Sequence, residues 1–204
     1  MGFFGNLYHD EEAEKIGNEF QSKIFNTSIS IKKFIEDPNE KYDYEGHEEG
    51  WGFNLDLKDK DNKIPPINWI TVNGLLTCMS MKIITSEATK ENKSESYKEA
   101  VINKLFKKMA EKLNLNSSGF SQQVVEKYAP QYLGNLGVVA QSGPLGILSS
   151  EYDIEIKAAS HTITENLFKG NINFYVYKDY SKERYNRHYE ETCKRIYDII
   201  RSSF

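Results

Sequence analysis

A chain of 204 residues with 11 Phe, 13 Tyr and 2 Trp has enough large side chains to build one sizeable core, which excludes disorder throughout. Its formal net charge of −4 argues against a protein dedicated to nucleic acid, because binding phosphates requires an excess of Lys and Arg on one face. No run approaches the ~18 apolar residues of a membrane helix, and the first residues lack the features of a secretion signal. We therefore expect a soluble, cytoplasmic protein without membrane contact.

The two cysteines do not indicate a metal site. Cys78 and Cys193 lie 115 residues apart, and neither has a second ligand at metal-binding spacing. Each falls within an expected element, where a free thiol behaves as a small buried hydrophobe. We therefore expect a reducing compartment and no cofactor.

The chain is expected to begin with a helical element over residues 1–35. Its main helix covers about residues 10–25, because apolar residues recur there at helical spacing: Ala13, Ile16, Phe20 and Ile24. Acids in the first turn are favoured by the partial positive charge of the helix start. Residues 30–35 fit either a second short helix or a strand, and Pro38 ends the segment.

Three strands are expected in the next part of the chain. Residues 51–58 alternate between apolar and polar side chains, and residues 67–72 are apolar enough to be buried on both faces. Asn73-Gly74 then predicts a two-residue hairpin, because both residues tolerate a positive φ. The returning strand covers residues 75–84.

The second half of the chain adds two helices and two strands. Ser94 begins a helix with two adjacent apolar seams, and so wide a face predicts burial against a sheet. Residues 152–163 have the pattern of a long strand with a bulge at Ala158-Ala159, and residues 172–177 form a further strand. Ser181 caps the final helix.

This order of elements predicts a single α+β domain over residues 1–204. Short connections between successive strands indicate hairpins, and therefore a mainly antiparallel sheet of about five strands. The N-terminal, central and C-terminal helices are expected to bury their apolar stripes on that sheet.

Residues 114–150, the neutral segment, contain only two charged residues, Glu126 and Lys127. The overall charged fraction of 27 % predicts about ten. The segment is rich in Gly, Ser, Asn and Gln, and a short helix around residues 121–132 is compatible with it. Two alternatives stay open: a long loop folded over one end of the sheet, or an exposed recognition surface, since interface cores are depleted in charge.

Residues 36–51 form an expected acidic loop that also carries aromatic side chains. Over residues 36–49, seven acids stand against one Lys. Carboxylates suit Ca²⁺ or Mg²⁺ and the imidazole of His47 would suit Zn²⁺, but no EF-hand spacing occurs. We therefore expect a solvated loop without a specific metal.

The strongest catalytic candidate lies in the expected strand 152–163. Asp153, Glu155 and Lys157 would share one face of a strand, because side chains alternate there. This pattern resembles the acidic-x-Lys strand of the PD-(D/E)xK nucleases, and the resemblance implies Mg²⁺ held by the carboxylates and a water positioned by the lysine. Those enzymes need a further acid shortly upstream, yet residues 127–150 contain none.

Two other groups of residues lack the arrangement that a metal site or a phosphate loop requires. His161 would lie about 20 Å from Glu155 along a strand, too far for a shared ion. The glycines of the neutral segment lack the Gly-Lys-Ser/Thr ending of a phosphate loop.

The sequence favours a non-catalytic interaction protein, adaptor-like or inhibitor-like, that binds another macromolecule or itself through the neutral segment and the acidic loop. A protein partner or a homo-oligomer is expected, with aromatic side chains supplying affinity and acids supplying orientation. The expected partner-binding residues are Tyr42, Tyr44, Trp51, Tyr128, Tyr132, Leu136, Val138, Leu145 and Ile147. The alternative is a Mg²⁺-dependent phosphodiesterase or nuclease that uses Asp153, Glu155 and Lys157. A small-ligand pocket between sheet and helix forms a third class.

Overall fold

The computed structural model describes residues 3–36, 41–42, 51–52, 69–142, 152–170 and 182–204. Seven α-helices are present in this part of the chain: α1 (Phe3–Glu36), α3 (Trp69–Lys90), α4 (Glu95–Lys112), α5 (Ser117–Gln123), α6 (Ala129–Ser142), α7 (Asp153–Gly170) and α8 (Lys182–Arg201). A five-residue π-helix, η1 (Val124–Tyr128), joins α5 to α6. Strands β1 (Lys41–Tyr42) and β2 (Trp51–Gly52) form one short antiparallel pair, with Lys41 opposite Gly52.

The fold is therefore all-α, and the expected α+β domain with a five-stranded antiparallel sheet is wrong. Within the described residues, the two-residue strands β1 and β2 are the whole of the sheet structure. Of the expected strand over residues 51–58, residues 53–58 lie outside the described residues, as do the expected strand over residues 172–177 and Ser181. None of the helices in the described part of the chain combines the length and the apolar character needed to cross a bilayer.

Helix α3 replaces the hairpin expected at Asn73-Gly74. All ten residues from 71 to 80 are buried, so this part of the helix shows no polar side. A helix buried all round loses its 3.6-residue period, and its apolar runs then look like buried strands. Asn73 lies inside the helix and its side-chain Nδ2 donates to the Ser28 hydroxyl at 3.0 Å and to the Trp69 carbonyl at 2.8 Å. The Asn-Gly pair is therefore a core packing feature and not a turn.

Helix α7 replaces the long strand expected over residues 152–163. Its buried side includes Ser160, Thr162 and Thr164, polar residues that hide the apolar period of the helix. The Thr162 hydroxyl donates to the Ala158 carbonyl, and the Thr164 hydroxyl donates to the Ser160 carbonyl, each at 2.7 Å. Bonds to the carbonyl four residues back satisfy hydroxyls inside a helix, so a threonine-rich segment is buried here without joining a sheet.

The helices expected at the N-terminus and at Ser94 are confirmed. Helix α1 includes residues 10–25 and continues through residues 30–35, which settles that segment as helix. Ser94 is the N-cap of α4, and its hydroxyl accepts the backbone N–H of Tyr97 at 3.2 Å. Helix α4 packs on helices and not on a sheet.

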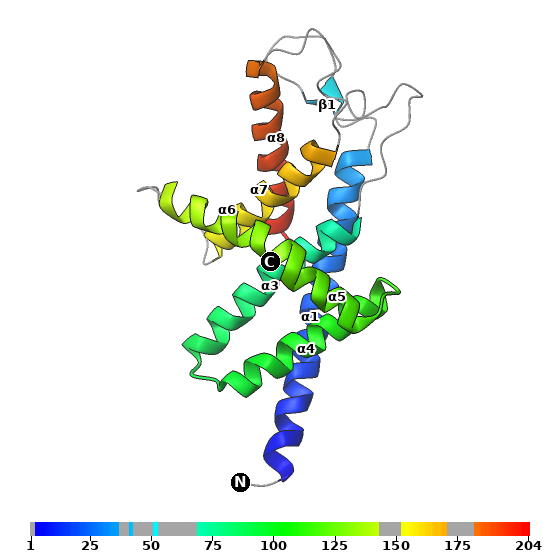
Figure 1. Ribbon diagram of the computed structural model, residues 1–204, viewed down its shortest axis with the longest axis vertical. Coiled ribbons are helices and arrows are strands. Elements are labelled where there is room, and N and C mark those ends of the chain that lie inside the picture. Colours follow the sequence, from blue (N-terminus) through cyan, green and yellow to red (C-terminus); the bar gives the residue numbers. More distant parts are fainter. Residues whose placement is uncertain (1–2, 37–40, 43–50, 53–68, 143–151, 171–181) are drawn as a thin grey trace.

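Helix α3 is the centre of the molecule. It contacts α1, α4, η1, α6 and α7, and these contacts form the main apolar core. Helix α1 follows the long axis and α4 crosses it (Figure 1). Helix α8 packs mainly on α7.

Ion pairs reinforce the crossing of α1 and α4. The Lys104 ammonium lies 3.0 Å from an Asp10 carboxylate oxygen and 3.2 Å from one of Glu14, and Lys108 lies 2.5 Å from the other Glu14 oxygen. Next to them a Cβ on Gly17 would lie 3.1 Å from the Cβ of Lys104, which shows how closely the two helices approach. Part of the basic side of α4 is therefore paired with α1.

Candidate functional site

From Ser117 to Ser142 the neutral segment is one continuous helix. Asn116 caps its start, because the side-chain Oδ1 accepts the backbone N–H groups of Ser118 at 2.9 Å and Gly119 at 3.2 Å. From there α5, η1 and α6 follow without a break to Ser142. The expected short helix around residues 121–132 is thus a part of a longer one.

The π-helical turn η1 precedes a proline. The backbone N–H of Ala129 donates to the Val124 carbonyl, five residues back instead of four. Pro130 follows directly; it has no N–H to donate, and its ring collides with the carbonyl one α-helical turn earlier. A wider turn at this point relieves that collision and lets the helix continue as α6.

One side of this helix belongs to the core. Phe120, Val124, Tyr128 and Tyr132 recur every four residues and are all essentially inaccessible to solvent. The ring of Tyr128 lies so close to α3 that a Cβ on Gly74 would be 2.2 Å from a ring carbon. The Thr71 hydroxyl also donates to the Tyr128 oxygen at 3.5 Å. Tyr128 and Tyr132, both expected at a partner surface, therefore pack inside the protein.

Tyr132 has an unusual environment for a phenol. Its hydroxyl is buried and no hydrogen-bond partner within the described residues satisfies it. Burial raises the pKa of Tyr132 far above its ordinary value, and the nearby negative charge of Glu155 raises it further. The group is a neutral, structural phenol. The four-residue spacing from Phe120 to Tyr132 was the sequence signal for this buried side.

The opposite side of the helix is exposed and apolar. We call its α6 part the α6 face and define it by Leu133, Gly134, Gly137 and Val138. Leu133 is 55 % exposed and Val138 is 62 % exposed. The other exposed large apolar side chains among the described residues are Val125 of η1, at 56 %, and Ile29, at 37 %. From Tyr128 to Ser142 the helix contains no charged residue.

The two glycines of the α6 face have no packing role among the described residues. A Cβ added to Gly134 or to Gly137 would meet no atom of those residues within 4 Å, in contrast to Gly17 and Gly74. A glycine in an exposed helix interior costs about 1 kcal/mol relative to alanine. Packing among the described residues of one copy does not account for that cost. Because glycine has no side chain, the helix surface between Leu133 and Val138 is a flat strip.

Helix α6 is held to α7 by uncharged polar side chains. Asn135 Nδ2 donates to the Thr162 hydroxyl at 3.1 Å, and Asn166 Nδ2 donates to Gln131 Oε1 at 2.9 Å. Leu136 is half-buried and packs against the core. Of the residues expected to bind a partner, Val138 is thus the one that the structure places on the α6 face.

The remaining expected partner residues cannot be assigned to this surface. Tyr42 and Trp51 are opposite each other in the β1–β2 pair, although the structure describes only their backbone. Tyr44, Leu145 and Ile147 lie outside the described residues.

The residues of the expected acidic-x-Lys strand do not converge. They begin helix α7, in which Glu155 is rotated by about 200° from Asp153, at 3.6 residues per turn. Asp153 and Lys157 lie one turn apart and form an ion pair at 2.6 Å. The Tyr197 hydroxyl of α8 donates a hydrogen bond to the same carboxylate. The premise of the nuclease alternative, three side chains on one strand face, is therefore contradicted.

Asp153 instead joins α7 to α8. Its side chain is almost completely buried. Burial raises its pKa, but the hydrogen bonds from Lys157 and Tyr197 and the charge of Arg201 outweigh burial and lower the pKa overall. The carboxylate is ionised and structural. Within the described residues no group of three His, Cys, Asp or Glu side chains could hold a metal ion.

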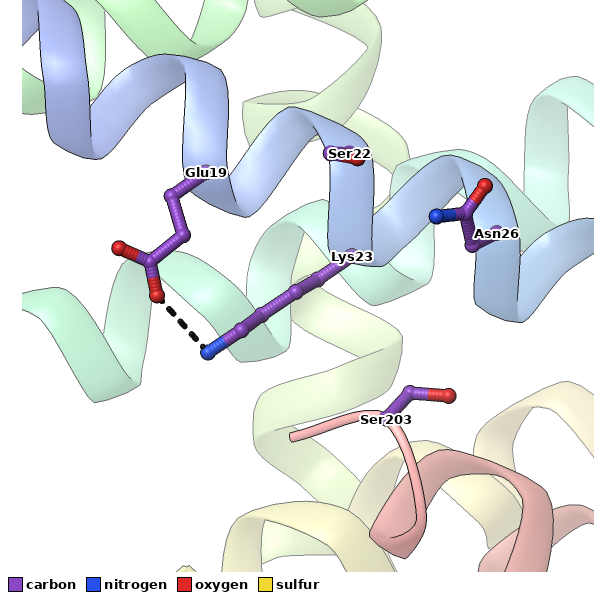
Figure 2. A pocket seen from close by; sticks show the side chains of 5 residues that line it. All are labelled: Glu19, Ser22, Lys23, Asn26 and Ser203. Atoms are coloured by element: carbon purple, nitrogen blue, oxygen red, sulfur yellow. Dashed lines mark ion pairs between the residues drawn. The ribbon is translucent and has the colours of Figure 1, made fainter.

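A shallow polar cavity of about 420 Å³ lies between α1 and the residues that follow α8. Figure 2 shows its lining, which consists of Glu19, Ser22, Lys23, Asn26 and Ser203. Lys23 and Glu19 form an ion pair at 3.0 Å, and the Lys23 ammonium also lies over the Phe20 ring at 5.3 Å. The one acid and the one base of this cavity therefore neutralise each other, and its lining holds no histidine that could activate the Ser22 or Ser203 hydroxyl.

Comparisons of the chain with protein-family models, with curated proteins and with solved structures find no match.

Proposed function

We propose that this chain is a non-catalytic interaction protein and that the α6 face is its contact surface. The observation that carries the proposal is the concentration of exposed apolar side chains on one uncharged helix side. Interface cores are depleted in charge, because charged groups lose hydration when a partner covers them. Leu133 and Val138 can be covered without that penalty.

The chemistry of the described residues supports a non-catalytic role. Burial raises the pKa of the Cys78 thiol to about 12, and burial also raises the pKa of Cys193. Such thiols are poor nucleophiles. Two free, buried cysteines also support the proposed reducing, cytoplasmic compartment. The acidic loop over residues 36–51 stays a sequence-based prediction of a second contact.

A charge placed on the α6 face tests the proposal. Leu133→Glu introduces a carboxylate at a side chain that is 55 % exposed, so the free energy of unfolding should change by less than about 0.5 kcal/mol. Gln123→Glu is the matched control, because it adds the same charge at an exposed position of α5 outside the α6 face. Both variants should retain the helical circular dichroism of the wild type.

The measurement is quantitative affinity capture with the purified full chain as bait. We expect a defined set of proteins, or the chain itself, to be retained by the wild type and by Gln123→Glu but to be at least tenfold depleted with Leu133→Glu. If all three baits retain the same proteins in the same amounts, the α6 face is not the contact surface and the proposal is wrong.

A further inference from the structure

We propose that the occupant of the α6 face is α6 of a second copy of this chain, packed antiparallel across a two-fold axis. The inference rests on the proposed function and names its partner. It is carried by three observations on Leu133, Gly134, Gly137 and Val138: their charge, their order along the helix, and the room above the glycines.

Charge favours a second copy over other partners. The chain carries a net charge of −4, so two copies repel each other overall. Helix α6 contains no charged residue, and two copies that meet there bring no like charges together at the contact. A strongly charged partner would find no opposite charge on α6 to steer or orient it.

The order of the four residues is symmetric. In an antiparallel pair of helices related by a two-fold axis, residues whose numbers have a constant sum lie level with each other. With the axis between Asn135 and Leu136, Leu133 lies level with Val138 of the second copy. Gly134 then lies level with Gly137 of the second copy. The two residues at the axis, Asn135 and Leu136, face inward, where Asn135 bonds to Thr162 of α7.

The glycines provide the room for close approach. Residues 133, 134, 137 and 138 fall within about 140° of the helix circumference and form one stripe. No atom of the described residues lies within 4 Å of the position of a Cβ at either glycine, so the backbone itself is open to contact. Leu133 and Val138 of each copy can then pack beside the glycine strip of the other, as ridges pack into grooves. This contact explains two helix-destabilising residues that packing within one copy leaves unexplained.

The size of the contact predicts a weak dimer. Helix α6 has 14 residues and is about 21 Å long. One pair of such helices covers less than the ~800 Å² per partner of a standard stable interface. We therefore expect a dissociation constant on the order of micromolar or weaker.

Sedimentation velocity of the full chain from about 1 to about 500 µM tests the dimer, together with three variants. Leu133→Glu should remove association, and Gln123→Glu should leave it unchanged. Gly137→Ala is the discriminating variant. The added methyl group should raise the melting temperature of the monomer, because alanine favours helix, while it weakens dimerisation at least tenfold, because it fills the strip. A merely structural role for Gly137 cannot produce opposite changes in stability and association.

Cysteine cross-linking tests the antiparallel register. An equimolar mixture of Leu133→Cys and Val138→Cys chains should give mainly the mixed disulfide on mild oxidation, whereas a parallel pair would give mainly disulfides between two chains of the same variant. Mainly disulfides between two chains of the same variant would overturn the antiparallel register. A wild-type protein that stays monomeric at every concentration would overturn the second copy as occupant.

For a monomeric wild type, the proposed function still stands if Leu133→Glu loses a captured heterologous protein, and it falls if the set of captured proteins is unchanged.

Discussion

Gly74→Ala is the substitution that most directly tests the packing of the molecule. The added Cβ would lie 2.2 and 2.4 Å from two ring carbons of Tyr128, whereas carbon atoms in contact are about 3.5–4.0 Å apart. The ring is fully buried and cannot swing into solvent. Overpacking of this kind costs about 1–3 kcal/mol or more, and the gain of about 1 kcal/mol from alanine in a helix offsets only part of it. We expect a net loss of about 2 kcal/mol.

Urea denaturation monitored by circular dichroism, at a protein concentration that keeps the chain monomeric, measures this loss. Gly134→Ala is the matched control, because no atom in the described part of the chain lies within 4 Å of its Cβ position, and it should raise the free energy of unfolding by about 1 kcal/mol. In a Tyr128→Ala background the ring is gone, so Gly74→Ala should become neutral or stabilising. If Gly74→Ala instead stabilises the wild type as much as Gly134→Ala does, the contact between α3 and η1 is wrong.

Three further predictions concern polar groups and a helix end. Tyr132→Phe removes a buried hydroxyl that has no hydrogen-bond partner among the described residues, so it should raise the free energy of unfolding by about 1 kcal/mol. Tyr197→Phe deprives the buried Asp153 carboxylate of a hydrogen bond, so it should lower the free energy of unfolding by about 1–3 kcal/mol. Urea titration compares the two variants. The folded-state pKa values of Glu14 and Asp153 are lowered, and hydrogen bonds from lysines of α4 are the main cause for Glu14. The two carboxylates therefore stabilise the fold fully above their unfolded pKa values of 4.5 and 3.8. This stabilisation is lost as the pH falls through the folded-state pKa values. The melting temperature should therefore fall as the pH drops below about 4.5, and the fall should be shallower in Glu14→Gln; an identical pH profile would contradict the α1–α4 ion pairs. Asn114 has a φ of 54° at the end of α4, in the left-handed region that glycine adopts without strain. Asn114→Gly should therefore leave the melting temperature unchanged or raise it, and Asn114→Ala should lower it. Equal effects of the two substitutions would rule out a left-handed cap.

Local signals in the sequence were sufficient for the helices that have both a polar and an apolar side. The stripe from Ala13 to Ile24 and the cap at Ser94 depend on neighbours within one or two turns, and both predictions are confirmed. Helix α3 could not be recognised in this way. Its ten consecutive buried residues, 71–80, show no period, and Asn73-Gly74, a strong hairpin signal in the sequence, lies inside this buried helix.

Helix α7 shows the same limit for polar residues. Alternation of Asp153, Glu155 and Lys157 indicated a strand face, but the ion pair between Asp153 and Lys157 spans one helical turn. The threonines that favoured a strand are satisfied by carbonyls of their own helix. Two-residue and 3.6-residue periods are hard to distinguish when polar groups are buried.

The lack of charge along the neutral segment is a property of residue order alone, and it located the surface that we propose for binding. Which side of that segment faces outward depended on packing. Tyr128 is buried because Gly74, distant in the chain, leaves space for its ring, and α7 holds the polar edge of α6 through Asn135. Partners so far apart in sequence meet only after the chain folds, so the four-residue spacing from Phe120 to Tyr132 marks one side of the helix but does not decide whether that side, or the side with Leu133, enters the core.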